Sequence, residues 1–390
     1  MIKRNILDCM TLVGGTPLRF EGEKTYVSTG AVDCDHVDYA QTERVTYDNR
    51  PSRANLSVAE GDILFAKMCG TKKTLRIDRP LSEHLYSTGF CAVRANESLM
   101  DAALLYHLLA SDQFLTQKDQ NSSGATQKAI TNAGLRKIVI QVPDLPEQRK
   151  LAANLDCIEQ MMANRREQLV SFDQLVKSRF IELFGDPASN SPKWDTGRLG
   201  DYMTTLTDFS ANGSYALLDS QVVMYDEPHY AIMVRTTDLE TGDLKNGVKY
   251  IDQKAYELLG KSKLFGGEMI MNKIGSAGKI YLMPHIETPA SLGRNAFMFR
   301  FDQRVNIVFL YALLTSEYGT AEIQQHIRGA VTKTITKEST RSIRIIVPPI
   351  ELQEQFAAFV EQTDKSKLAV QKGLQELEIL KKSLMQQYFG

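Results

Sequence analysis

The chain has 390 residues, of which 43% are hydrophobic, so it is long enough to form two or three domains with buried cores. Its 46 Lys and Arg residues almost balance its 47 Asp and Glu residues, which excludes a strongly acidic DNA mimic and means that any anion-binding site must be local. The five cysteines form no CxxC pair, so we expect reduced thiols and a cytoplasmic protein. No segment approaches 18 consecutive apolar residues, so we expect no membrane contact.

Residues 1–143 are expected to form a first globular domain of mixed strands and helices. A buried strand is predicted over 61–67, where an apolar run follows a glycine, and a basic loop comes directly after it. The leucines of 101–114 predict a helix, and 121–128 is a polar loop that contains glycine. A strand over 138–142 then leads out of the domain.

Residues 144–185 predict one long helix. Pro146 suits its first turn, and neither proline nor glycine recurs before Gly185. Apolar residues at steps of four and three form a heptad seam, which must be buried against another helix. The seam consists of Leu151, Leu155, Ile158, Met162, Leu169, Phe172 and Val176.

The second half of the chain repeats this plan. A polar linker over 186–193 leads to a second globular domain over 194–348, and a second long helix follows over 349–390. The second seam consists of Phe356, Val360, Val370, Leu374, Leu377 and Leu384. These seam residues are also our candidates for helix pairing and for docking of partner subunits.

The two halves are copies in sequence at their ends. Residues 124–185 match 329–390 without a gap, with 19 identities in 62 positions, and the strand over 61–67 matches 267–273, whereas the segments between these anchors are dissimilar. A shared scaffold with divergent interiors suggests two modules of one type that recognise different things. The identical pairs include Gly124 and Gly329, Lys128 and Lys333, Thr131 and Thr336, Pro143 and Pro348, and Gln148 and Gln353.

These motifs resemble those of a known family. A duplicated Val-Pro-x-Leu/Ile-x-x-Gln helix start, a long helix that ends in Phe-Gly, and an upstream Gly-Ala loop with Lys-x-Ile-Thr are similar to the specificity subunit of Type I restriction-modification systems. The resemblance covers nearly the whole chain. It implies an α+β fold in which two target-recognition domains are separated by two long antiparallel coiled-coil helices with an internal pseudo-twofold repeat.

The resemblance also implies a function. Such a subunit is not catalytic: it reads a bipartite double-stranded DNA target, docks two methyltransferase subunits, and can be joined by restriction subunits. S-adenosylmethionine, ATP and Mg²⁺ belong to those partners, so this chain needs no cofactor of its own. The alternative is a two-module protein-interaction scaffold built on a coiled coil, without DNA readout, with which the near-zero net charge is compatible.

DNA contacts require cations for phosphates and Arg, Lys, Asn or Gln for base edges. The duplicated pairs Lys128/Lys333 and Thr131/Thr336 are the strongest candidates, because both copies keep them in a polar loop. The other candidates in the first domain are Lys67, Lys72, Lys73, Arg76 and Gln127. Those in the second domain are Lys273, Ser276, Lys279, Arg294, Asn295, Arg328 and Thr332.

Signatures of catalysis are missing from the sequence. No Asn/Asp-Pro-Pro-aromatic tetrapeptide of an adenine methyltransferase occurs, and 275–279 lacks the spacing of a phosphate-binding loop. The six histidines are scattered without the spacing of a metal site. A stand-alone nuclease or methyltransferase is therefore disfavoured.

Overall fold

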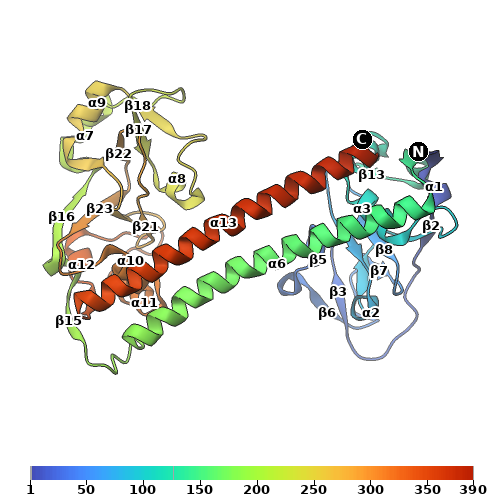
Figure 1. Ribbon diagram of the computed structural model, residues 1–390, viewed down its shortest axis with the longest axis horizontal. Coiled ribbons are helices and arrows are strands. Elements are labelled where there is room, and N and C mark those ends of the chain that lie inside the picture. The colour runs from blue at the N-terminus through green and yellow to red at the C-terminus, as the bar shows by residue number, and fades with distance from the viewer. Residues whose placement is uncertain (1, 126, 390) are drawn as a thin grey trace. The chain divides into compact units, whose positions relative to one another are not determined.

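The computed structural model describes residues 2–125 and 127–389 (Figure 1). The chain divides into two compact units: unit 1 comprises Met1–Gln168 and Val370–Gly390, and unit 2 comprises Leu169–Ala369. Each unit holds one mixed α/β module together with part of each long helix. The predicted end of the second helix at Gly390 lies outside the described residues.

The two predicted long helices are confirmed. They are α6 (Leu145–Phe184) and α13 (Ile350–Phe389), and each has 40 residues. At the start of α6, the Asp144 carboxylate accepts a hydrogen bond from the amide of Glu147, which caps the first turn. Its end is set by Gly185, whose φ of 72° is the left-handed conformation in which helices terminate.

Within each unit the two helices run antiparallel, as predicted. In unit 1, Glu159 pairs with Lys381 at 2.7 Å and Arg166 lies 3.8 Å from Glu378, so residue numbers rise along α6 as they fall along α13. In unit 2, Asp173 pairs with Lys367 at 2.6 Å, and the Phe180 and Phe356 rings meet at 5.5 Å. The seam residues are all buried or half-buried.

The start of each long helix is part of a module core. Leu151 and Leu155 are buried with the leucines of α3 (Ala102–Leu109) in unit 1, and Phe356 is buried with Phe309 of α10 (Ile307–Thr315) in unit 2. The first turns of each seam therefore pack against their own module and also against the end of the other long helix: Phe356 meets Phe180 and Phe184, and Leu384 packs against the cluster that contains Leu151. This differs from a seam devoted to helix pairing alone.

Module 1 spans 2–142 and contains two four-stranded sheets in the orders β2-β11-β8-β9 and β6-β3-β10-β7, with β1 paired to β14. Its short helices are α1 (Ile6–Cys9), α2 (Arg79–Ser82), α3 (Ala102–Leu109), α4 (Asp112–Gln120) and α5 (Asn132–Leu135). Its strands are β1 (Ile2–Asn5), β2 (Met10–Val13), β3 (Lys24–Val27), β4 (Val32–Asp33), β5 (His36–Val37), β6 (Glu43–Val45), β7 (Ala54–Leu56), β8 (Ile63–Ala66), β9 (Thr74–Arg76), β10 (Leu85–Ser87), β11 (Phe90–Ala95), β12 (Ser122–Ser123), β13 (Ala129–Ile130) and β14 (Val139–Val142).

Module 2 spans 195–347 and has the same architecture, with sheet orders β16-β23-β20-β21 and β18-β17-β22-β19 and with β15 paired to β24. Its short helices are α7 (Tyr215–Gln221), α8 (Thr236–Thr241), α9 (Gln253–Leu258), α10 (Ile307–Thr315), α11 (Glu317–Gln325) and α12 (Lys337–Arg341). Its strands are β15 (Asp195–Arg198), β16 (Met203–Asp208), β17 (Ala231–Val234), β18 (Lys249–Ile251), β19 (Lys263–Leu264), β20 (Met269–Asn272), β21 (Ile280–Leu282), β22 (Ala290–Leu292), β23 (Ala296–Phe301) and β24 (Arg344–Val347).

The repeat therefore extends through the dissimilar segments. The one parallel strand pair of each second sheet, β3 with β10 and β17 with β22, occupies the two central positions in both modules. The helix predicted over 101–114 is in fact two helices, α3 and α4, because the Ser111 hydroxyl accepts a hydrogen bond from the amide of Phe114 and starts a new helix. Ser316 caps α11 in module 2 in the same way.

Among the described residues, no helix combines the length and the apolar character that crossing a bilayer would require.

Candidate nucleic-acid interface

Two loops of module 1 are joined by backbone hydrogen bonds, and we call them the paired loops. The first, 67–73, follows strand β8, and the second, 121–131, follows helix α4. The amide of Cys69 donates to the carbonyl of Lys128 at 2.9 Å, and the amide of Ile130 donates to the carbonyl of Lys67, also at 2.9 Å. Basic residues from distant parts of the sequence are thereby brought to one place.

Module 2 repeats this arrangement in its own paired loops, 273–279 and 328–336. The amide of Gly275 donates to the carbonyl of Lys333, and the amide of Ile335 donates to the carbonyl of Lys273, both at 3.0 Å. Lys333 corresponds to Lys128 in the sequence repeat, and both side chains are exposed. The duplicated lysines thus occupy equivalent places in the two modules.

The duplicated glycines of these loops are explained by geometry. Gly124 has a φ of 141° and Gly329 a φ of 101°, both in the region that L-residues avoid. A β-carbon on Gly124 would lie 2.4 Å from the carbonyl oxygen of Gln127, and one on Gly329 would lie 2.1 Å from that of Thr332. Only glycine permits so tight a turn in front of the duplicated lysine.

The duplicated threonines have a structural role. Thr131 is the N-cap of α5, and its hydroxyl accepts a hydrogen bond from the amide of Gly134 at 3.2 Å. Thr336 caps α12 and accepts from the amide of Ser339 at 3.1 Å. Capping accounts for their retention in both copies, so duplication alone no longer points to DNA contact for this pair.

The other candidates in module 1 lie in different surroundings. Lys72 pairs with Asp112 at 2.6 Å, and Lys73 donates to the carbonyl of Thr29 at 2.8 Å. Gln127 is exposed beside Lys128, and Lys67 is half-buried at the base of the paired loops. The paired loops therefore bring Lys67, Gln127 and Lys128 together, whereas Lys72 and Lys73, at the end of the first loop, are held by Asp112 and Thr29.

Arg76 is not part of this group. It lies on β9, its guanidinium pairs with Asp156 of α6 at 2.5 Å, and it stacks 4.2 Å from the centre of the Tyr106 ring. The structure thus places Arg76 where module 1 meets its long helix. The ion pair between Arg76 and Asp156 could not be predicted from the sequence, because the two residues are far apart along the chain.

Among the candidates in module 2, Lys273 is held in the paired loops by a 2.8 Å ion pair with Asp208, which Lys337 shares at 2.9 Å. Lys279 pairs with Glu240. The remaining candidates are exposed on or beside the paired loops: Ser276, Arg294, Asn295, Arg328 and Thr332. In contrast, the side chains of Lys128 and Lys333 make no ion pair within the part of the chain that the structure describes.

Asp208 and Lys337 were not predicted as site residues. Burial alone would raise the pKa of Asp208, but the contacts with Lys273 and Lys337 outweigh it and lower the pKa. The carboxylate therefore stays charged and fixes two lysines at the base of the paired loops. Sequence reasoning missed this group because Asp208 is far from both lysines along the chain and lies in a segment without a recognisable counterpart.

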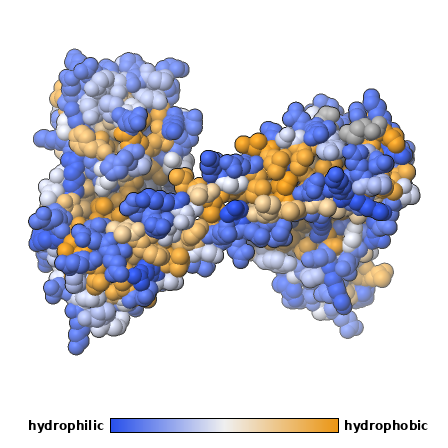
Figure 2. Space-filling view, viewed as in Figure 1, coloured by the Kyte–Doolittle hydropathy of each residue, from blue (hydrophilic) through white to orange (hydrophobic). Residues whose placement is uncertain are grey.

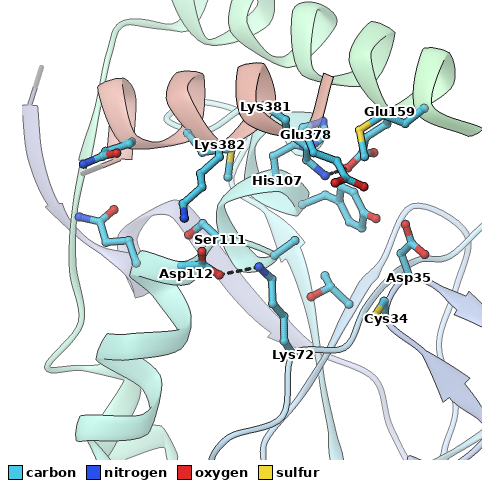
Figure 3. A pocket seen from close by; sticks show the side chains of 17 residues that line it. Cys34, Asp35, Lys72, His107, Ser111, Asp112, Glu159, Glu378, Lys381 and Lys382 are labelled. Atoms are coloured by element: carbon cyan, nitrogen blue, oxygen red, sulfur yellow. Dashed lines mark hydrogen bonds and ion pairs between the residues drawn. The ribbon is translucent and has the colours of Figure 1, made fainter. Parts of the chain in front are cut away.

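A cavity of about 680 Å³ lies in unit 1 between module 1 and the helices (Figure 3). On one side His107, which is fully buried, places its Nε2 2.8 Å from Asp156 and its Nδ1 3.5 Å from Glu159. The ligand atoms of these three residues lie within 4.8 Å of one another, which is close enough to consider a metal ion. However, Arg76 and Lys381 already neutralise the two carboxylates, so the arrangement fits an ion-pair network better than a metal site.

This network predicts a specific acid sensitivity. Burial alone would raise the pKa of Glu159, but the contacts with His107 and Lys381 outweigh it and lower the pKa from 4.5 to about 2. A carboxylate with a lowered pKa stabilises the fold fully above the unfolded value of 4.5, and this contribution is lost as the pH falls toward 2. We expect Glu159→Gln to remove on the order of 2 kcal/mol of stability at pH 7 and to flatten the loss between pH 4.5 and 3.

Urea unfolding between pH 3 and 7, followed by far-UV circular dichroism, measures this effect. Glu361→Gln is the matched control, because Glu361 is 70% exposed and pairs with Lys365 one turn away on the same helix. An identical pH profile for Glu159→Gln and the unmodified chain would contradict the prediction.

Comparison with known proteins agrees with this geometry. The family of the Type I restriction modification DNA specificity domain matches residues 15–170 and 194–379. The curated Type I restriction enzyme EcoBI specificity subunit of Escherichia coli is 19% identical over 290 residues, which are 70% of this chain and 60% of that protein. The chain thus spans about three fifths of the length of the curated relative that it matches.

Two solved structures share the fold. One, described as showing complex assembly and conformational transition of the type I R-M system, is 20% identical with a TM-score of 0.58, covering 100% of this chain and 97% of that chain. The other, the S subunit of a Type-I restriction-modification system from M. genitalium, is 16% identical with a TM-score of 0.58, covering 100% and 96%. Since the family matches most of both halves, this chain belongs to the Type I restriction modification DNA specificity domain family and carries two copies of the domain.

Proposed function

We propose that this chain is the DNA-reading subunit of a Type I restriction-modification complex, in which each module reads one half of a bipartite target. The observation that supports this most is the recurrence of the paired loops, with the same backbone hydrogen bonds and an exposed lysine at the same place in both modules. Exposed cations on loops that are joined by backbone hydrogen bonds are suited to phosphate contacts, which position a protein on a duplex. Different side chains around a shared scaffold suit two different half-sites.

The long helices are suited to binding other subunits of such a complex. Exposed apolar side chains occur on them in each unit, and Figure 2 shows hydrophobic residues among hydrophilic ones on the visible face. In unit 1 these residues are Met161, Ile379 and Leu380, and in unit 2 they are Val170, Leu175, Ile181 and Leu368. We propose that two methyltransferase subunits dock here, one on the helices of each unit, since each unit presents exposed apolar side chains of its own. Leu175 and Leu380 correspond in the repeat, whereas the other exposed apolar positions differ between the two copies.

In this proposal the chain is itself not catalytic and acts in the cytoplasm. S-adenosylmethionine would be bound by the methyltransferase subunits, and ATP and Mg²⁺ by a restriction subunit where one joins. The five cysteines are free thiols, which suits a reducing compartment.

The test is selection from a random-sequence duplex library by the full chain assembled with the methyltransferase subunits of its own host. We expect the recovered sequences to share two short conserved blocks at a fixed gap, and binding to weaken steeply with salt. Recovery of unselected sequence at moderate salt would contradict the proposal. It would favour a two-module scaffold that binds proteins.

The duplicated lysines should act on affinity and not on sequence. In the same complex, replacing Lys128 and Lys333 together with Ala should remove two phosphate contacts and reduce the slope of log K against log salt concentration by about 1.8, since each contact contributes about 0.9. The conserved blocks should stay unchanged. The control removes two exposed lysines elsewhere, Lys3 and Lys254; an equal effect of the control pair would show that only net charge matters.

A further inference from the structure

One turn lies beside the paired loops in both modules and has a different sequence in each. In module 1 it is Thr88–Gly89, between β10 and β11, and in module 2 it is 293–295, between β22 and β23. The amide of Lys67 donates to the carbonyl of Gly89 at 2.9 Å, and the amide of Lys273 donates to the carbonyl of Asn295 at 2.8 Å. The turn is thus fixed to the same point of the paired loops in the two modules.

The side chains of the two turns have different hydrogen-bonding capacities. Module 1 presents Thr88 and Gly89, whereas module 2 is one residue longer and presents Arg294 and Asn295 after a glycine. Two modules can make the same contacts to DNA phosphates, but their contacts to bases must differ if they recognise different half-sites. A turn that is attached to the same point of the paired loops in both modules, but differs in length and in side chains, meets this requirement, whereas the duplicated Lys128 and Lys333 do not.

Asn295 is held in an unusual conformation that keeps its amide exposed. Its φ of 68° is in the left-handed region, which asparagine tolerates better than most residues. The residue is exposed, and its side-chain amide makes no hydrogen bond within the described ranges 2–125 and 127–389. Both a donor and an acceptor are therefore free at this point, which is the pattern that pairs with the major-groove edge of adenine.

Arg294 is oriented before any ligand binds. Its guanidinium pairs with Asp219 of α7 and lies 5.0 Å from the centre of the Phe209 ring, while the side chain remains 44% exposed. Together with Asn295 it borders a hollow of about 360 Å³ whose other walls include Met224 and Thr236. A guanidinium has five donor hydrogens, so one ion pair leaves others for a second partner.

We propose that Arg294 and Asn295 contact base edges in the half-site that module 2 reads, with Arg294 on a guanine and Asn295 on a neighbouring adenine. This inference rests on the proposed function and assigns the sequence-reading role within module 2 to a single turn. It also separates these residues from Lys333, which contacts phosphate.

The test compares the full chain with Asn295→Gly and Arg294→Lys, each assembled with the methyltransferase subunits and selected on the same random-sequence duplex library. Glycine accepts the left-handed φ, so Asn295→Gly removes the amide without disturbing the turn. Lysine keeps the charge of Arg294 but not its forked geometry. Each variant should lose discrimination at one base pair by about tenfold or more, which is the range for a lost bidentate contact.

The other half-site is an internal control, since module 1 is unchanged. One conserved block should degrade at a single position while the other block and the gap stay constant. Unaltered blocks with both variants, or an equal loss at every position of both blocks, would overturn the assignment but leave the proposed function standing. If the unmodified complex selects no sequence, the proposed function fails first and this assignment falls with it.

Discussion

Replacing Phe356 with Ala should lower the free energy of unfolding of unit 2 by about 3–5 kcal/mol, the usual cost of removing a buried phenylalanine ring. Phe356 is fully buried, and its ring meets those of Phe180 and Phe184 edge-on at 5.5 and 5.6 Å. Phe309 completes the cluster, 4.7 Å from Phe184. The cluster joins both long helices to α10 of module 2, so the cavity left by alanine would weaken all three elements together.

The fluorescence of Trp194 can be used to measure the unfolding of unit 2. Trp194 is the single tryptophan, its indole donates to the carbonyl of Phe184 at 2.9 Å, and it packs on the core of module 2. Its fluorescence during urea unfolding therefore follows unit 2. Leu368→Ala is the control, since Leu368 is on the same helix but 67% exposed and should change stability by less than about 0.5 kcal/mol. A Phe356→Ala transition that overlays the control would contradict this account of the core.

The long helices were predictable because their signals are local, and the duplication was predictable because it appears when the chain is aligned with itself. Pro146 near the start, Gly185 at the end and apolar steps between them define α6 without knowledge of tertiary structure. Repeated residues such as Lys128 and Lys333 needed only comparison of the chain with itself. The paired loops could not be predicted, because they depend on hydrogen bonds between segments distant in sequence, such as Cys69 with Lys128.

The duplicated sheets were not predictable from sequence either. Strands such as β3 and β17 are only four residues long, and their sequences agree only at the last position: β3 is Lys-Thr-Tyr-Val with its last two residues buried, whereas β17 is Ala-Ile-Met-Val and is buried throughout. A sheet accepts many apolar sequences provided that the buried volume is right, so topology was retained while identity was lost. For the same reason, the partners of Arg76 and Asp208 came only from the structure.

The duplicated glutamines Gln148 and Gln353 show what a repeated motif can mean structurally. Both are buried one turn into a long helix. Gln353 accepts a hydrogen bond from the amide of Asn306 at 2.8 Å and donates to the carbonyls of Pro348 and Arg304 at 2.7 and 3.5 Å.

Gln148 forms the same set in unit 1. It accepts from the amide of Asp101 at 2.8 Å and donates to the carbonyls of Pro143 and Leu99 at 2.9 and 3.0 Å. Asp101 is the N-cap of α3 and Asn306 is the N-cap of α10. Each glutamine therefore ties the start of a long helix to the start of a helix in the module core.

Gln353→Leu should destabilise unit 2 by about 2–4 kcal/mol, because each buried backbone group left without a partner costs about 1–3 kcal/mol.

Gln353→Glu distinguishes lost hydrogen bonds from lost shape, because an ionised carboxylate can accept a hydrogen bond from the amide of Asn306 but cannot donate to the two carbonyls. Burial and these carbonyls favour the neutral acid, so they raise the pKa of the new carboxyl above its unfolded value. Its stabilising contribution is then present at low pH and lost as the pH rises, so the Glu variant should recover relative to the Leu variant between pH 7 and 5. Trp194 fluorescence in urea at both pH values measures this; equal stability of the two variants at pH 5 would indicate that Gln353 acts by packing alone.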